Sequence, residues 1–241
     1  MRKTSSKPIA QMPAPVSIAE RIANRLQAEI ISGPYTPGER LVERQIGERF
    51  EVSSIPVREA LQILETRGLV MKRLNRGCTV IDLSVEEMVQ MCELRDLLEP
   101  KVAEWAACRR TEAELEELRA RLARLREAAE SGNLSRFFSE DLEFHLCLWK
   151  LANNPSAARA LTTVLGCLFA CGLRSAALDL REQYAKHQRL FQAIADSRPS
   201  DAALLLTDIS AGFRSQLYRI SQDRPDESSN PITRIAISRV R

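Results

Sequence analysis

The chain of 241 residues lacks any apolar run long enough for a membrane-spanning helix, which takes about 18 to 20 residues. Residues 1–16 are basic and contain proline, but they lack the apolar core of a secretory signal peptide. We therefore expect a cytoplasmic protein with no membrane partner, whose residues 1–16 form a flexible N-terminal tail.

A strong excess of charge is also missing, because 35 Lys and Arg residues are balanced by 32 Asp and Glu residues. The formal net charge of +3 gives no whole-molecule argument for nucleic acid binding. Any DNA-binding surface must therefore come from local clustering of arginines.

Cysteine pairs at metal-binding or redox spacing are absent, since none of the six cysteines forms a CxxC motif. Most of them fall in apolar helical runs, where buried reduced thiols are expected. Cys167 and Cys171 share one helix face, but we favour packing over metal binding for this pair. Histidine is scarce as well, and His145 and His187 are the only two in the chain.

Residues 41–81 predict a helix, a tight turn, a second helix and two short strands joined by a basic turn. Apolar residues recur at helical spacing in both helices, and Gly68 is a natural C-terminal stop. Residues 69–71 and 79–81 suit strands. This pattern is typical of a winged helix-turn-helix, which inserts its second helix into a DNA groove.

Capping boxes, in which Ser or Thr precedes Glu by three residues, predict helix starts at Ser17, Ser84 and Thr111. Everything from Ser84 to about Arg219 is expected to be helical, with breaks near 132–133, 153–155 and 197–199. The last stretch alternates apolar and polar residues, which suits either a strand or a disordered segment. The expected domains are the tail 1–16, a winged helix-turn-helix at 17–83, an all-helical domain at 84–221 and a C-terminal tail at 222–241.

Two resemblances extend this interpretation. The segments PGERLVERQIGERF and VSSIPVREALQILETRGLV resemble the N-terminal domain of the GntR family of bacterial transcription regulators, over about Ser17 to Leu83. The segments ELRDLLEPKVAEWAA, DLEFHLCLWKLANNPSAARAL and HQRLFQAIAD resemble the FCD effector domain of the FadR branch of that family. The resemblance implies a mostly α fold, with a winged helix-turn-helix followed by a helical bundle. It also implies a homodimeric regulator of a pseudo-palindromic double-stranded operator, not an enzyme.

The start of the second helix, Ser54 to Gln62, is the expected recognition segment, because the N-terminal residues of such helices reach base edges. Arg58 and Gln62 lie one turn apart, and arginine is a strong guanine reader. In the alternative, Arg44 and Arg58 only pair with Glu48 or Glu59 on a solvated surface. The resemblance implies DNA contacts at Arg44, Arg58 and the wing, and this chain departs from it with serine at position 54. The expected DNA-binding set is Arg44, Ser54, Ile55, Arg58, Gln62, Arg76 and Gly77.

Asp141 and His145 are four residues apart, so they project from one helix face. The resemblance implies that Asp141, His145 and His187 match three ligands of a metal site inside the helical bundle. The fourth ligand position falls near Asp208, where the family has histidine. Such a set would suit Zn, Ni, Mn or Fe. The alternative is a pair of ordinary core histidines with an intrahelical ion pair.

Arg95 is a candidate partner for an anionic effector, because a guanidinium can bind a carboxylate through two hydrogen bonds. Its alternative role is a salt bridge to Glu99 or Asp141. We expect a regulator, most simply a repressor, controlled by a small carboxylate or sugar acid, by metal, or by both. The other hypotheses are a metalloenzyme with a DNA-binding domain, a metal sensor, and a bundle that serves only for dimerisation.

Overall fold

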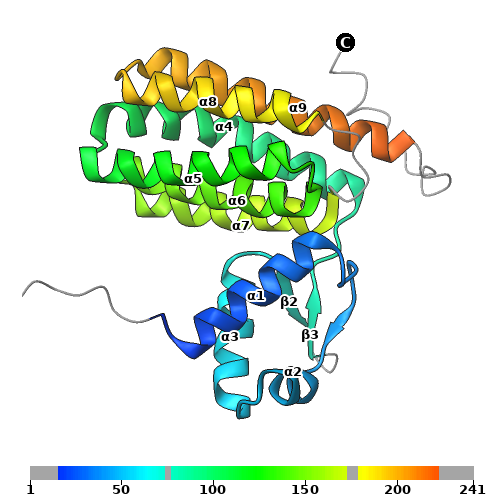
Figure 1. Ribbon diagram of the computed structural model, residues 1–241. Helices are drawn as coiled ribbons and strands as arrows, with labels where there is room; N and C mark the ends of the chain where they lie inside the picture. Colours follow the sequence, from blue (N-terminus) through cyan, green and yellow to red (C-terminus); the bar gives the residue numbers. More distant parts are fainter. Residues whose placement is uncertain (1–15, 74–76, 173–178, 223–241) are drawn as a thin grey trace, which may run out of the picture.

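The computed structural model describes residues 16–73, 77–172 and 179–222. It is mostly α-helical, with a small winged domain below a bundle of long helices (Figure 1). The elements of the winged domain are α1 (Ile18–Ser32), β1 (Arg40–Leu41), α2 (Glu43–Phe50), α3 (Ser54–Thr66), β2 (Val70–Arg73) and β3 (Gly77–Val80). Those of the bundle are α4 (Val85–Arg109), α5 (Glu112–Glu130), α6 (Leu134–Leu151), α7 (Pro155–Gly172), α8 (Leu180–Ala195) and α9 (Pro199–Gln222).

The winged domain joins three helices to a three-stranded antiparallel sheet of order β1-β3-β2. Helix α1 packs against α3 through fully buried side chains, among them Leu26 and Leu61. The predicted hairpin is present as β2 and β3, with Val70 opposite Val80. Strand β1 was not predicted, and it adds a third strand by pairing Arg40 with Thr79.

Each predicted helix start carries the expected cap. The Ser17 hydroxyl accepts a hydrogen bond from the Glu20 amide at 3.1 Å, and complete capping boxes begin α4 and α5 at Ser84 and Thr111. The sequence did not predict the break between α7, which ends at Gly172, and α8, which begins at Leu180. Asp179 caps α8 by accepting hydrogen bonds from two backbone amides. That aspartate, followed three residues later by glutamate, was the available sequence signal.

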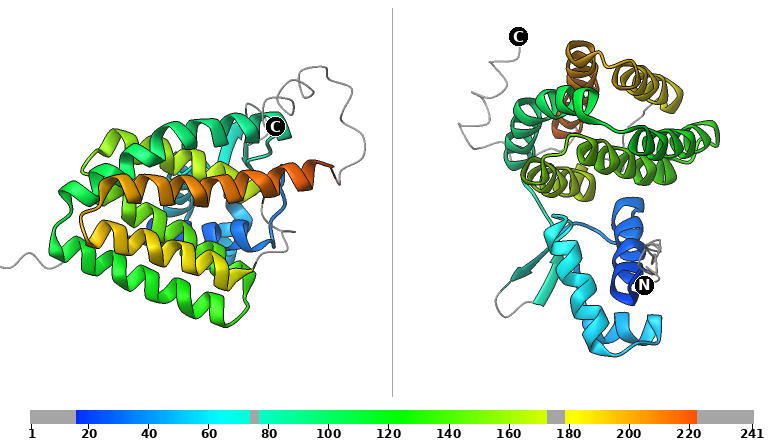
Figure 2. Two further views of the ribbon diagram at one scale, coloured as in Figure 1. Left: turned by 90° about the horizontal axis from the view of Figure 1, so that it is seen from above. Right: turned by 90° about the vertical axis from the view of Figure 1, so that its left-hand side faces the viewer.

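In the helical domain α4 packs along α9 and also contacts α6, α7 and α8, whereas α5 packs between α6 and α8. The end-on view in Figure 2 places α4 on the side of the bundle away from α5. Large side chains such as Phe144, Leu148 and Trp149 fill the interior of the bundle. Among the described helices, none is long and apolar enough to cross a membrane.

The two domains meet closely at the C-terminal end of α3. Gly68 adopts a left-handed φ of +73°, and a Cβ atom there would overlap the carbonyl oxygen of Thr163 in α7. A Cβ atom on Gly166 would likewise overlap the carbonyl oxygen of Arg67. The Thr163 hydroxyl donates a hydrogen bond to the Thr66 carbonyl at 3.1 Å. Backbone therefore packs against backbone at this junction.

Substituting Gly166→Ala should lower the free energy of unfolding by about 1–3 kcal/mol, because the new methyl group cannot fit without moving α7 away from α3. Chemical denaturation monitored by circular dichroism measures this loss. Gly212→Ala is the matched control, since the nearest atom to its new methyl group would be the flexible Lys186 Nζ at 3.7 Å. The control should be neutral or slightly stabilising. Equal stability of both variants would contradict the close junction.

Candidate DNA-binding surface and metal centre

The turn between α2 and α3 sets the angle between the two helices. Glu51 ends α2 in the left-handed region at φ 55°, and its amide donates hydrogen bonds to the Glu48 and Gly47 carbonyls. The Val52 amide also donates to the Gly47 carbonyl, at 3.0 Å. A Cβ atom on Gly47 would lie only 3.1 Å from the Val52 oxygen, so a small residue suits this tight turn.

The predicted recognition residues of α2 and α3 lie on one exposed surface. Ser54 and Gln62 are exposed, and Ile55 is exposed over 66% of its surface, which is unusual for a large apolar side chain. Arg44 and Arg58 line a hollow between α2 and α3. The surface thus presents guanidinium, amide, hydroxyl and apolar groups together, as base-edge and phosphate contacts require.

Both arginines of this surface form exposed ion pairs. Arg58 Nε donates to Glu43 Oε2 at 2.8 Å, rather than to the Glu59 considered from the sequence, and Arg44 Nε lies 3.8 Å from Glu48 Oε1. An exposed pair of this kind contributes only about 0–1 kcal/mol. The pairs therefore position the guanidinium groups without preventing their transfer to DNA.

The wing contributes a second part of the surface. Gly77 begins β3 with a left-handed φ of +76° and is exposed, whereas Arg76 lies outside the described residues. Two cations that sequence reasoning missed lie beside it: the Arg40 guanidinium near Gly77, and the exposed Lys72, whose Nζ donates to Gln62 Oε1 at 2.9 Å. The position of Arg40 depends on the pairing of β1 with β3, which the local pattern did not reveal.

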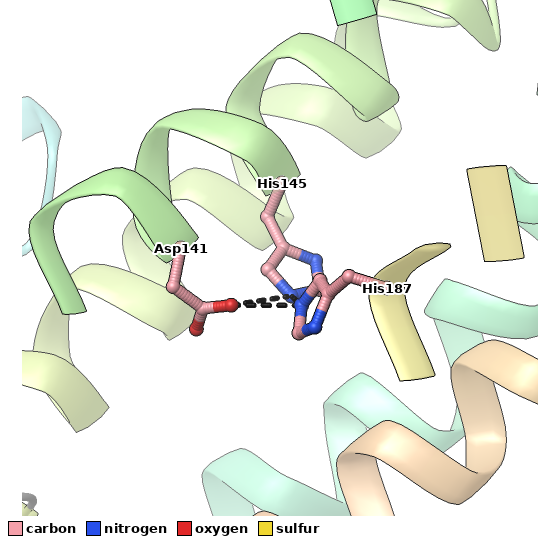
Figure 3. Close-up of side chains that lie close together, drawn as sticks. All are labelled: Asp141, His145 and His187. Atoms are coloured by element: carbon pink, nitrogen blue, oxygen red, sulfur yellow. Dashed lines mark hydrogen bonds and ion pairs between the residues drawn. The ribbon is translucent and has the colours of Figure 1, made fainter. Parts of the chain in front are cut away.

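Asp141, His145 and His187 come together inside the helical domain (Figure 3). Asp141 and His145 extend from α6, and His187 extends from α8. Asp141 Oδ1 lies 2.7 Å from His187 Nε2 and 3.9 Å from His145 Nε2, and the two Nε2 atoms are 3.4 Å apart. Both rings are almost fully buried. We call these three residues the triad.

The hydrogen bonds and charges of the triad define its protonation. His187 Nδ1 lies 2.8 Å from the Gln183 carbonyl, which can only accept, so Nδ1 carries a proton. Burial lowers the pKa of His187, but the Asp141 carboxylate outweighs burial and raises this pKa above its ordinary value. Burial lowers the pKa of His145 to about 4. Without metal, Asp141 and His187 therefore form an ion pair beside a neutral His145.

The triad is chemically suited to a divalent metal ion. Its three ligand atoms lie within 4.8 Å of one another, and two ligands bound about 2.1 Å from one ion are separated by roughly 3 to 3.5 Å. The Gln183 carbonyl fixes the His187 tautomer that leaves Nε2 for the ion, as outer partners of metal-binding histidines commonly do. Two imidazoles and a carboxylate suit several transition metals.

The structure does not bring the predicted fourth ligand, Asp208, into the cluster with the triad. Its carboxylate is on the outside of α9, where its side chain is 57% exposed and pairs with Lys186 Nζ at 3.1 Å. Ile209 and Ser210 are the buried residues at this level of α9. Because each residue turns a helix by about 100°, an uncertain register at the preceding turn was enough to assign the wrong side chain. Asp208 is therefore removed from the ligand set.

Arg95 lies on α4 and is almost fully buried. Glu99 binds it through two hydrogen bonds of 3.1 Å, and the Ser210 hydroxyl donates to the same carboxylate. This is the salt bridge that the sequence left as an alternative. The charge of Arg95 still reaches the triad, where it helps to lower the pKa of Asp141. Burial, which raises this pKa, and the two histidines, which lower it, have larger effects.

Comparison with known proteins identifies both domains. Residues 18–80 match the bacterial regulatory proteins of the gntR family, and residues 90–211 match the FCD domain. The chain belongs to the GntR family of bacterial transcriptional regulators. It is a regulator with an FCD effector domain rather than an enzyme. FCD domains often bind metal, and the triad is a possible site of that kind.

Relatives and solved structures agree with this assignment. The chain is 28% identical to the HTH-type transcriptional regulator LutR of Bacillus subtilis over 76% of this chain and 97% of LutR. It is 33% identical to the HTH-type transcriptional repressor RspR of Escherichia coli, over 56% of this chain and only 60% of RspR. The structure of E. coli McbR/YncC has the same fold, with a TM-score of 0.72 at 23% identity, covering 86% of this chain and 99% of that one.

Substituting Arg58→Ala should weaken specific operator binding by about 5- to 150-fold, because a bidentate base contact is worth roughly 1–3 kcal/mol. Fluorescence anisotropy measures this on an operator that the unaltered protein selects from a random duplex pool. Arg126→Ala is the control, since Arg126 forms a similar exposed ion pair with Glu130 in α5, away from the DNA-binding surface. Equal losses in both variants would refute the recognition role of Arg58.

Removing a residue that only hydrogen-bonds to a metal ligand typically weakens metal binding by roughly 10- to 100-fold. Substituting Asp141→Asn should weaken divalent metal binding by more than this, because Asp141 is itself a proposed ligand. The exposed Asp208→Asn should leave metal binding unchanged. Isothermal titration calorimetry with zinc on metal-stripped protein compares the two variants. A larger loss for Asp208→Asn than for Asp141→Asn would reverse the ligand assignment made above.

Proposed function

We propose that this protein is a homodimeric repressor of the FadR branch of its family, released from its operator by a small organic acid that binds together with a divalent metal ion. The triad carries this proposal, because it places three metal-binding groups in the interior of the effector domain. The ion would be Zn, Ni, Mn or Fe. When bound, it would supply positive charge and open positions for carboxylate oxygens.

The surroundings of the triad favour an anionic effector. Arg95 contributes positive charge from α4, as the lowered pKa of Asp141 indicates. His145 Nδ1 and Trp149 Nε1 are buried and have no hydrogen-bond partner in the described part of the chain. Buried donors of this kind normally have an acceptor. A small carboxylate or sugar acid offers such acceptors together with negative charge.

A chain of polar contacts connects α6, the helix that carries Asp141 and His145, to the recognition helix. Glu143 lies between Asp141 and His145 on α6, and its carboxylate accepts a hydrogen bond from Gln27 of α1 at 3.4 Å. Gln27 in turn accepts from Arg67 at 2.8 Å, at the C-terminal end of α3. We infer that a shift of α6 on effector binding moves α3 through these contacts. Such coupling requires the acid to bind the released state more tightly than the DNA-bound state.

Dimerisation would place two winged domains on the two halves of a pseudo-palindromic operator. The spacing of the half-sites would then follow from the distance between the two α3 helices. A repressor role is consistent with the repressor RspR among the relatives. A bacterial regulator of this kind acts where its operator DNA is, which places it in the cytoplasm.

The proposal predicts that an organic acid whose binding requires the metal ion will lower the affinity of the protein for its operator. Small carboxylic and sugar acids are first screened by thermal shift, with and without each divalent metal, because a ligand of the folded state raises apparent stability. Anisotropy on the selected operator then tests each compound found. His187→Ala should keep operator binding and lose the response, whereas Glu143→Ala, which removes the acceptor for Gln27, should keep metal binding and respond more weakly.

Three outcomes would contradict parts of this proposal. A change in operator affinity with metal alone would make the ion the signal. A full response in His187→Ala would exclude the triad as the site. A full response in Glu143→Ala would exclude the contact through Gln27 as the connection to DNA binding.

A further inference from the structure

Helix α4 presents an apolar stripe on its outer side. Leu97 is exposed over 75% of its surface and Leu94 over 45%, although both belong to a helix whose opposite side is packed in the core. Single exposed leucines are ordinary, but neighbouring ones on a single helix stripe mark an interaction surface. In the end-on view of Figure 2, this helix lies on the side of the bundle away from α5.

The charges along this stripe are arranged so that they complement a second copy of the same stripe. Leu97 is the middle residue of the 25-residue helix, with the exposed Glu93 four positions before it and the exposed Lys101 four positions after it. In an antiparallel pair with its two-fold axis at Leu97, Glu93 of each copy faces Lys101 of the other. The exposed Gln90 then faces Glu104 of the second copy.

A parallel pairing of the two helices is disfavoured by the same residues. It would bring Glu93 against Glu93 and Lys101 against Lys101, and like charges in contact are repulsive. An antiparallel pair also aligns the helix dipoles favourably. Within one copy, Lys101 Nζ contacts Glu104 at 2.6 Å, and both side chains stay partly exposed, so Lys101 keeps room for a second carboxylate.

We propose that the face of α4 formed by Gln90, Glu93, Leu94, Leu97 and Lys101 binds the same face of a second copy of this chain, in antiparallel orientation. This α4 face is the dimer contact of the effector domain. The inference rests on the homodimer of the proposed function and adds its interface. It assigns the occupant of the stripe from charge complementarity.

Disulfide trapping tests the two-fold axis. Packed helices lie about 8–10 Å apart with their Cα atoms about 2.3 Å from each axis, so facing Leu97 Cα atoms would be roughly 3.4–5.4 Å apart, which overlaps the range of about 4.4–6.8 Å that a disulfide spans. Leu97→Cys is introduced into the full chain with the exposed Cys108 changed to serine. Leu204→Cys in the same background is the control, because Leu204 is 70% exposed but belongs to α9. Mild oxidation should produce a covalent dimer of Leu97→Cys and not of the control.

A charge exchange tests the orientation. Glu93→Lys or Lys101→Glu alone should each raise the dimer dissociation constant by about tenfold, since each change creates two repulsive contacts. The double variant Glu93→Lys with Lys101→Glu should return it to the original value. Analytical ultracentrifugation of the full-length variants measures this, and circular dichroism verifies that each variant is folded.

The outcomes separate this inference from the proposed function. A dimeric protein in which Leu97→Cys crosslinks no better than Leu204→Cys, or in which the charge exchange restores nothing, overturns the α4 face and leaves the homodimer intact. A monomer at micromolar concentration, with and without operator DNA, overturns both. Efficient trapping together with rescue by the double variant establishes the antiparallel contact.

Discussion

The backbone of the recognition helix meets the effector domain directly, and the relative position of the two domains depends on this contact. The Arg67 carbonyl occupies the space that a side chain on Gly166 would fill, and Thr163 donates a hydrogen bond to the neighbouring Thr66 carbonyl. Side chains at an ordinary interface can change rotamer, whereas two close-packed backbones can separate only if a whole element moves. The direction of α3 therefore follows α7 and α1 rather than the linker between the domains. Any movement inside the bundle that reaches α6 or α7 must change the presentation of α3.

The interior of the bundle contains more charge than stability alone would require. Asp141 is paired with His187, and Arg95 with Glu99, all of them nearly removed from solvent. A buried ion pair gains little or nothing over apolar residues of the same volume, although breaking it by removing one partner costs about 3–5 kcal/mol. The two pairs lie close enough that Arg95 influences the pKa of Asp141. Their presence is consistent with the recognition of an ion and an anion that we propose.

The sequence predicted features that depend on neighbouring residues and missed those that depend on distant ones. Capping boxes and the helix-turn-helix pattern are local signals, and the helices began where these signals predicted. Strand β1 has only two residues, and its existence depends on pairing with β3 far along the chain. The positions of Asp141, His145 and His187 came from resemblance, whereas their closeness required α6 and α8 to pack on the helices α4 and α5 that they share. Asp208 was assigned wrongly because one helix position decides between the core and solvent, as the neighbouring buried Ser210 shows.

Helix α4 has two faces with different tasks, and its rigidity connects them. Arg95 and Glu99 are buried in the bundle, while Leu94 and Leu97 of the same helix are exposed. Helix α4 spans about 37 Å and contains Pro100, but Leu94, Arg95 and Leu97 all lie in the segment before this proline and turn together. A rotation of α4 that repositions Arg95 around an effector must therefore also turn the outer stripe. If that stripe holds the second copy, effector binding changes the angle between the two subunits as well as the position of α3 within each. Two routes of this kind would act together, because half-site spacing depends on both the subunit angle and the direction of each recognition helix.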